Sequence, residues 1–453
     1  MKITVLVKYS RGEINPFDAS ALECALALSD EVTVLSMAPR SAEAGLSALT
    51  RLGVRAVLVC DPLYAGSDTI ATAHILSSAI RRLAPDVIFA GRQSVDGDTG
   101  QVPPMLAELL GLTLVPRATE MNGTELTLRS MDRIELACGM LVTFEKIRRL
   151  RFPSIFSRAK AVEVWDNTVL ALAPERCGLQ GSPTRVVSSY ESSVGRRECS
   201  FVAKDELDTL IREGLTRAGL SADFSECENK LPLVLALGEV ESAARSIAER
   251  VVYLDHRGKD IATLAEEIEL LSPDAVLFDD ADEIKALGAR IAAVLGVGMC
   301  ADCISFTVKD GRLVMTRPAL GGNITADIVS TRRPVFASVR SVRQGGSRLV
   351  FTVGMGALPY IDRLRALSDR YGAELASTRP VADSGSMPYV SQVGVTGRII
   401  APSVLVTFGV SGAVQHTAAI SGAGTVIAVN SDRSARIFDY ADFGIVTDVN
   451  DII

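Results

Sequence analysis

A glycine-rich turn near residue 410 has the residue types of a nucleotide-binding site. It follows an apolar, β-branched run, Val404 to Phe408, which predicts a buried parallel strand. Gly409 and Gly412 permit a tight turn, and Ser411 can cap a helix that carries His416. Such a helix start presents free N–H groups to a phosphate or a flavin carbonyl. Taken alone, a histidine at a helix start is more often a capping or structural residue than a ligand contact.

A second candidate loop, Gly91 to Val102, follows an expected strand at 85–90. Its small residues let the backbone approach a ligand, Asp96 can meet a ribose or an adenine, and Thr99 and Gln101 can bind a phosphate. The same composition would suit a divalent cation. It would equally suit an Asp/Gly-rich surface loop that caps the next helix.

Cys300 and Cys303 have the spacing of a redox or metal pair. No second pair and no nearby histidine completes a metal site, so none is predicted. We therefore interpret them as two partly buried thiols and rank a dithiol oxidoreductase as a remote alternative.

The elements that would position these loops alternate between strand and helix. Expected strands at 3–7, 32–36, 56–60 and 85–90 are separated by helical segments, which predicts an α/β fold with a doubly wound parallel sheet. Ligands of such sheets bind at the carboxyl ends of the strands. The 453 residues allow about three domains.

The pattern then repeats. Residues 80–89 are echoed by 268–278, and 107–111 by 292–296, which predicts two similar domains related by a pseudo-twofold axis. In place of the first copy's loop, the second has Asp279 to Glu283, which we interpret as a solvated helix start.

Charge and hydropathy exclude some functions. The net charge of −7 argues against nucleic acid as a main partner. The eight cysteines lack a framework spacing, which indicates a reducing compartment. No apolar run reaches the roughly 18 residues of a membrane span, and the N-terminus reads as a strand, so we expect a cytoplasmic protein.

The segment Gly409 to His416 resembles the Gly-Ile-Ser-Gly-Ala-Ile-Gln-His signature of the electron transfer flavoprotein α subunit. Matching segments at 392–397, 427–430 and 441–448 lie around it in the family's order. The N-terminal half resembles the family's β subunit instead, at Gly91 to Val102 and at Asn15-Pro16-Phe17-Asp18. The resemblance thus implies a single-chain fusion of a β-like and an α-like half.

The resemblance also implies the domain organisation. We expect a β-like nucleotide-binding domain at 1–190, a connecting arm at 191–230, a shortened α-like scaffold domain at 231–340 and an α-like FAD-binding domain at 347–453. Gln344 to Ser347 is a plausible hinge before the last of these.

Two cofactor sites follow from the resemblance. In the C-terminal domain, His416 would donate to the N1/O2 edge of FAD, Arg379 would lie against the ring and Thr396 would meet N5; Arg379 could instead form a surface salt bridge. The implied FAD contacts are Ser377, Arg379, Gln392, Gly394, Thr396, Gly397, Ser411, Gly412, Ala413, Gln415, His416, Asn430 and Asp448. In the N-terminal domain, AMP or a second FAD would contact Asp96, Gly97, Asp98, Thr99, Gly100 and Gln101.

This sequence departs from the family at two places in the FAD domain. Val395 stands where the family has glutamine, and Gly354-Met355-Gly356 lacks an arginine on the pyrophosphate side. These departures keep open the alternative of a nucleotide-binding or sensing module that has lost its redox flavin.

The resemblance implies an electron carrier without catalytic residues of its own. Its donors would be flavin dehydrogenases such as acyl-CoA dehydrogenases, and its acceptor a quinone oxidoreductase or a ferredoxin. NADH-driven bifurcation, which would make the protein an oxidoreductase, stays open.

Overall fold

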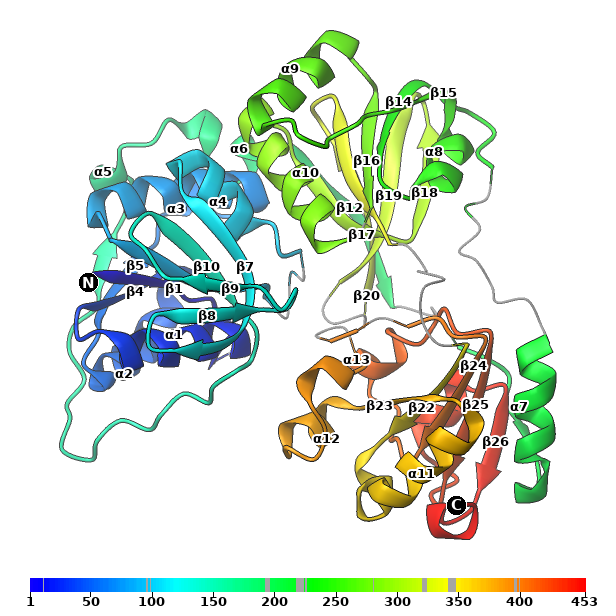
Figure 1. Ribbon diagram of the computed structural model, residues 1–453. Helices are drawn as coiled ribbons and strands as arrows, with labels where there is room; N and C mark the ends of the chain where they lie inside the picture. The colour runs from blue at the N-terminus through cyan, green and yellow to red at the C-terminus, as the bar shows by residue number, and fades with distance from the viewer. Residues whose placement is uncertain are drawn as a thin grey trace. The chain divides into compact units, whose positions relative to one another are not determined.

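The computed structural model describes most of the chain (Figure 1). The described residues exclude Arg11, Val95, Asp96, Asp98, 192–195, 217–223, Ser225, Asp280, 320–323, 341–347, Val395, Thr396 and Ile399. The chain divides into two compact units. Unit 1 comprises 1–188, 226–317 and 327–340, and unit 2 comprises 189–225, 318–326 and 341–453.

The first lobe of unit 1 is built on a largely parallel sheet with the strand order β11-β5-β4-β1-β6-β10-β7-β8-β9. Its apolar, β-branched strands are buried because helices cover the sheet, as parallel sheets require. The strands are β1 (Ile3–Leu6), β4 (Val32–Met37), β5 (Arg55–Val59), β6 (Val87–Gly91), β7 (Thr113–Asn122), β8 (Glu125–Leu128), β9 (Arg133–Glu135), β10 (Met140–Phe144) and β11 (Glu163–Trp165). The helices are α1 (Pro16–Leu28), α2 (Glu43–Leu49), α3 (Thr69–Leu83) and α4 (Val102–Leu110).

The second lobe of unit 1 repeats this plan. Its sheet order β15-β14-β16-β21-β17 matches β4-β1-β6-β10-β7, and its named strand pairs are all parallel. The elements are β14 (Leu231–Leu237), α8 (Glu241–Ile247), β15 (Ala248–Tyr253), α9 (Ile261–Leu271), β16 (Ala275–Asp279), α10 (Asp282–Leu295), β17 (Met299–Cys303) and β21 (Val335–Val339), with an antiparallel hairpin of β18 (Ser305–Lys309) and β19 (Arg312–Ala319). The predicted α/β class with two similar doubly wound lobes is confirmed.

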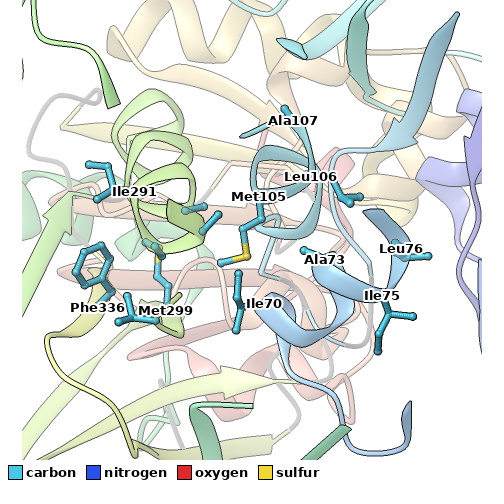
Figure 2. Packing of buried hydrophobic residues seen from close by; sticks show 14 of the residues in the cluster. Ile70, Ala73, Ile75, Leu76, Met105, Leu106, Ala107, Ile291, Met299 and Phe336 are labelled. Atoms are coloured by element: carbon cyan, nitrogen blue, oxygen red, sulfur yellow. The ribbon is translucent and has the colours of Figure 1, made fainter. Parts of the chain in front are cut away.

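The two lobes of unit 1 share one hydrophobic core. Helix α4 packs against α10, which holds the equivalent place in the second lobe. Figure 2 shows Met105 of α4 among the side chains of this seam, with Ile70 of α3 from the same lobe and Ile291 and Met299 from the second lobe. Arg290 of α10 also forms an ion pair with Glu108 of α4 at 2.8 Å.

Unit 2 has a parallel sheet with the order β13-β26-β25-β24-β22-β23. The connecting segment contributes β13 and α7, so part of the predicted arm belongs to this unit. Its main elements are β13 (Ser200–Phe201), α7 (Leu207–Thr216), β22 (Leu349–Val353), α11 (Ile361–Tyr371), β23 (Glu374–Ser377), α12 (Arg379–Asp383), β24 (Val404–Phe408), α13 (Val414–Thr417), β25 (Thr425–Asn430) and β26 (Phe443–Val446). Among the described residues, no helix has the length and apolar character needed to cross a membrane.

Candidate functional sites

The first lobe holds a cavity of about 970 Å³ at the carboxyl ends of its strands. After β1 the chain adds β4 and β5 on one side of β1 in the sheet and then continues with β6 on the other side. The strand order therefore reverses between β1 and β6. Open α/β sheets bind their ligands at such a point. Of the N-terminal residues predicted to bind a nucleotide, Gly97, Thr99, Gly100 and Gln101 line this cavity, whereas Asp96 and Asp98 lie outside the described residues.

Gln101 joins two helix starts at this cavity. Its side chain is 1% exposed, and its Oε1 accepts a hydrogen bond from the Thr69 hydroxyl at 3.1 Å. Thr69 is the first residue of α3, and Gln101 directly precedes α4. Gln101 Nε2 is buried without a hydrogen-bond partner among the described residues. A buried donor beside two helix N-termini suits an anionic ligand group, since both features favour negative charge.

Two further residues of this cavity were not predicted as site residues. Asn15 is buried, donates from Nδ2 to Gln93 O at 2.9 Å, and has an Oδ1 without a partner in the described part of the chain. Asp18 is also buried, and its carboxylate accepts the N–H groups of Lys8 and Gly91 at 2.7 and 3.0 Å. From the sequence, Asn15 to Asp18 were recognised only as a part of the resemblance to the β subunit, and no role in the site was predicted for these residues.

The second lobe has a buried carboxylate at the same edge of its sheet, at the end of the strand that corresponds to β6. Asp279 ends β16 and accepts the N–H groups of Glu239 at 3.0 Å and Ala281 at 2.8 Å. A Cβ on Gly238 would lie 2.5 Å from Asp279 Cβ, so the side chain packs closely against the end of β14. The interpretation of 279–283 as a solvated helix start is wrong for Asp279. This residue is buried, and it ends β16, whereas α10 begins at Asp282.

In unit 2 the strand order reverses between β22 and β24. Gly354 and Gly409 directly follow these strands, and Gly354 N–H donates to Phe408 O at 2.8 Å. A Cβ on Gly354 would lie 2.2 Å from Gly409 O, so the two turns touch through their backbones. The glycine-rich turn predicted to bind the cofactor therefore lies at the reversal point of this sheet.

His416 is the most informative side chain at this place. It is 5% exposed, and its Nδ1 lies 3.1 Å from Val393 O, which connects two segments implied by the family resemblance. Its Nε2 is buried and has no hydrogen-bond partner among the described residues. Burial lowers the pKa of His416 to about 4, so the imidazole is neutral near pH 7. A buried nitrogen without a partner costs free energy, which a bound group could offset.

The segment before β24 folds back on the end of β23. Ser377 is fully buried, and its carbonyl accepts Val393 N–H at 2.8 Å. Gln392 is buried too, and a Cβ on Gly397 would lie 2.3 Å from Gln392 O. A Cβ on Gly394 would make only an ordinary 3.4 Å contact with Gln415 O, so packing within the protein does not itself demand glycine there.

The turn after β24 is held by backbone contacts. Gly412 has φ +85°, and a Cβ on it would lie 2.2 Å from Ile437 N. Asn430, at the end of β25, donates from Nδ2 to Val410 O at 2.8 Å. The expected cap by Ser411 is wrong, because α13 starts after Ala413 and has no side-chain cap. Ser411, Ala413 and Gln415 are exposed.

Of three further predicted FAD contacts, Arg379 and Asp448 make local contacts and Thr396 lies outside the described residues. Arg379 forms an ion pair with Asp383, one turn further along α12, at 3.3 Å. Asp448 is exposed and accepts Asn450 N–H at 2.8 Å. Thr396 lies outside the described residues, as do Val395 and the proposed hinge at 344–347.

The two cysteines of the redox-like pair are both buried in β17. Burial raises the pKa of Cys303 well above its ordinary value. A thiol of this kind is a poor nucleophile, because the thiolate is the reactive form. In the part of the chain that the structure describes, no three His, Cys, Asp or Glu side chains gather to hold a metal ion.

Two family models match the chain. The electron transfer flavoprotein domain matches residues 3–133 and 232–343, and the electron transfer flavoprotein FAD-binding domain matches residues 346–421.

Three individual relatives each match less than half of the chain. Protein FixA of Azorhizobium caulinodans is 38% identical over 229 residues, which cover 44% of this chain and 82% of the relative. The electron transfer flavoprotein subunit beta of Clostridium acetobutylicum is 36% identical over 200 residues, 40% of this chain and 76% of the relative. The subunit alpha of Bacillus subtilis is 27% identical over 228 residues, 41% of this chain and 70% of the relative.

Proposed function

Because the chain belongs to the electron transfer flavoprotein family, as a single-chain fusion of a β-like and an α-like half, we propose that it carries electrons on an FAD bound in the domain at 347–453. The family's electron-transfer function and the match to its FAD-binding domain are the premise. We propose which residues hold the FAD, which ligand the N-terminal cavity binds and which partners the protein meets.

The observation that carries the proposal is the buried Nε2 of His416. Nδ1 is held by Val393 O, so the ring is fixed in orientation and only Nε2 is left to meet a bound group. The residues present fit FAD, since a polar atom without a partner lies beside a glycine turn at the reversal point of a parallel sheet. Among the described residues, Ser377, Gln392, Gly394, Gly397, Gly412 and His416 would hold the cofactor.

FAD supplies one- and two-electron redox chemistry when bound, and the protein adjusts it through nearby charge. His416 is neutral by itself because of burial. Negative charge next to Nε2 would raise the His416 pKa, so the ring would take up a proton there and donate a charge-assisted hydrogen bond. His416 would thereby favour the reduced form of the cofactor.

The N-terminal cavity is proposed to hold the adenosine phosphate part of AMP or of a second FAD. Its lining reaches from Gly91 on β6 past Leu6, Leu35 and Val59 to Val164 on β11. At about 4.8 Å between neighbouring strands, this row of five strands spans roughly 19 Å. A dinucleotide matches that length better than a mononucleotide does, so we expect a second FAD rather than AMP.

The partner surface is proposed to be the loop between β10 and β11. Phe152, Ile155 and Phe156 are 86%, 84% and 88% exposed, and large exposed apolar groups that lie together mark interaction sites. The loop is anchored, since Arg151 pairs with Glu23 at 2.7 Å. We propose that a flavin dehydrogenase, such as an acyl-CoA dehydrogenase, docks on these three apolar side chains of the loop.

The first experiment is extraction and quantification of the nucleotides bound per chain, beside a visible spectrum. Two FAD per chain would support both sites and justify a test with NADH. One FAD with one AMP would support a simple carrier. Protein without flavin that takes none up on reconstitution would overturn the proposal and favour a nucleotide-binding module, with Val395 the first position to change.

A further inference from the structure

The first turn of α1 holds three consecutive residues of the loop that enters the N-terminal cavity. Asn15 Nδ2 donates to Gln93 O at 2.9 Å, the Phe17 ring lies 5.1 Å from the Arg92 guanidinium carbon, and Asp18 Oδ1 accepts Gly91 N–H at 3.0 Å. One turn of helix therefore sets the path of the loop as it leaves β6. Thr99 and Gln101, which face the cavity, follow on that same loop.

Asp18 makes the contact that ties the two sides of the cavity together. Its carboxylate accepts N–H groups from Lys8, after β1, and from Gly91, at the end of β6. A Cβ on Gly91 would lie 2.3 Å from Asp18 Oδ1, so the carboxylate fits only because residue 91 is glycine. Both strand ends at the reversal point are thus fixed to one side chain that lines the cavity.

We propose that Asp18 is a positioning residue of the N-terminal nucleotide site, whose ionised carboxylate holds Gly91, and with it residues 91–93 at the start of the loop, in the position that suits the ligand. This inference rests on the proposed function of the cavity as a nucleotide site. Asp18 acts through the loop and is not assigned a contact with the ligand.

The ionised form is the one that can accept both N–H groups. Burial raises the pKa of Asp18 to about 7, against the hydrogen bonds from Lys8, Asn15 and Gly91 and the charge of Lys8, which lower it. The charged groups on the packed elements include Lys8 after β1 and Arg92 after β6. Glu145, Lys146 and Arg148 follow β10, and the Arg148 N–H group donates to Ser20 of α1. Glu23 on α1 itself pairs with Arg151, and β4, Val32 to Met37, contributes no charged group.

Protonation of Asp18 should change nucleotide binding and folding stability in opposite directions. Below pH 7 the Asp18 carboxyl takes up a proton and loses an acceptor, so its hold on Gly91 weakens and nucleotide binding weakens as the pH falls. Stability runs the opposite way, because a carboxyl whose folded pKa is raised contributes stability that is lost as pH rises through that pKa. Above pH 7 the protein keeps an ionised buried carboxylate at a cost in stability, which is typical of a residue retained for function.

The test compares wild-type protein with Asp18→Asn in full-length form. Binding of AMP, and separately of FAD, to the N-terminal site is titrated by calorimetry from pH 6 to pH 8, with the C-terminal FAD content as the measure of an intact fold. We expect Asp18→Asn to bind at least tenfold more weakly at pH 8 and to lose the pH dependence that wild type shows. Titration of the ligand phosphate is common to both proteins and cancels in the comparison.

Asp86→Asn is the matched control. Asp86 accepts Lys2 N–H at 2.7 Å and so ties β1 to β6 at the opposite end of the same strands. We expect this variant to bind nucleotide as wild type does. Equal binding by Asp18→Asn and wild type across the pH range would overturn the inference, as would an equal loss in Asp86→Asn.

If Asp18→Asn does not fold, the wild-type titration with FAD, whose pyrophosphate does not titrate in this range, decides the question. Binding that weakens as the pH falls from 8 to 6 supports the inference, and a flat profile overturns it. Wild-type protein that binds neither AMP nor FAD at this site would overturn the proposed function of the cavity itself.

Discussion

Arg117 and Asp302 occupy the same position in the two repeated lobes and carry opposite charge. Both residues lie in a β-bulge, in β7 and β17, with φ of 55° and 57°. Arg117 N–H donates to Thr143 Oγ1 and Asp302 N–H to Ser338 Oγ, each at 2.8 Å. The two lobes thus share the left-handed backbone conformation at this one position, whereas the side chain there is positive in the first lobe and negative in the second.

The two positions are neutralised by different partners: Arg117 pairs with Glu145 of its own lobe and with Asp282 of the second lobe, whereas Asp302 pairs with Lys285 of its own lobe. Burial lowers the pKa of Arg117 to about 10, and Glu145 pairs with it at 2.8 Å. Burial raises the pKa of Asp302, but the charge of Lys285, 2.6 Å away, contributes to holding it below its ordinary value. The similarity between the lobes is therefore one of fold and not of chemistry.

We predict that Glu145→Gln destabilises unit 1 strongly. Glu145 accepts ion pairs from Arg92, Arg117 and Arg129, and it is largely buried. Removing its charge takes the Glu145 anion from the largely buried Arg92 and leaves the largely buried Arg117 with Asp282 as its ion-pair partner, at a cost of about 3 kcal/mol. Denaturant unfolding at pH 7 measures this, and Glu125→Gln, in an exposed pair with Arg133, should cost less than about 0.5 kcal/mol.

The same side chain predicts a pH dependence. Burial raises the pKa of Glu145, but the arginines outweigh it and hold the pKa below the ordinary value. A depressed carboxyl pKa contributes stability that is present above the unfolded pKa and is lost as the pH falls through the folded one. Wild-type protein should therefore lose stability more steeply below about pH 4.5 than Glu145→Gln does. Parallel acid curves would contradict this.

We predict that His416→Ala lowers the reduction potential of the C-terminal FAD. A charge-assisted hydrogen bond is worth about 1.5 kcal/mol or more, which corresponds to about 60 mV for one electron. Spectroelectrochemical titration measures the shift. His74→Gln, a change in α3 of unit 1, is the control and should leave the potential unchanged. An unaltered reduction potential in His416→Ala would contradict the proposed contact between His416 and the flavin.

We predict that replacing Phe152 and Phe156 with serine slows electron exchange with a flavin dehydrogenase. Loss of two exposed anchors should lower kcat/KM at least tenfold, while the FAD content and potential stay the same. Stopped-flow reduction by a set of acyl-CoA dehydrogenases is the measurement. Met131→Ser, at another side chain that is 78% exposed, should have no effect. An equal rate in all variants would exclude the loop as the docking surface.

We predict that Gly412→Ala destabilises unit 2 and lowers its FAD content. The added Cβ would lie 2.2 Å from Ile437 N in a residue at φ +85°, so both backbone strain and a clash result. Gly385→Ala, at φ +79° with nothing within 4 Å of its Cβ, carries the strain alone and should cost about 1 kcal/mol. Calorimetric unfolding should show a clearly larger loss for Gly412→Ala. Equal losses would show that the turn relaxes freely.

Local pattern was enough to predict the architecture. Alternating apolar runs and helical segments predicted the α/β class, because strand and helix periodicity are properties of neighbouring residues. Two pairs of similar segments in the sequence predicted the repeated lobe. The resemblance in the last hundred residues likewise located the FAD-binding domain, which the family model matches from 346 to 421. These features depend on residues that are close in the chain.

Burial and long-range contact were decided only by the tertiary structure. Nothing in the neighbourhood of Asp279 showed that it is buried, since the Glu239 N–H group that it accepts is 40 residues away. Asn15 and Asp18 became visible as parts of the N-terminal cavity only because parallel pairing places the ends of β1 and β6 side by side. The sequence by itself determined which segments are strands, helices and glycine turns. Strand order determined which of their polar atoms meet, because the free energy of a buried polar group depends on partners that the local sequence does not specify.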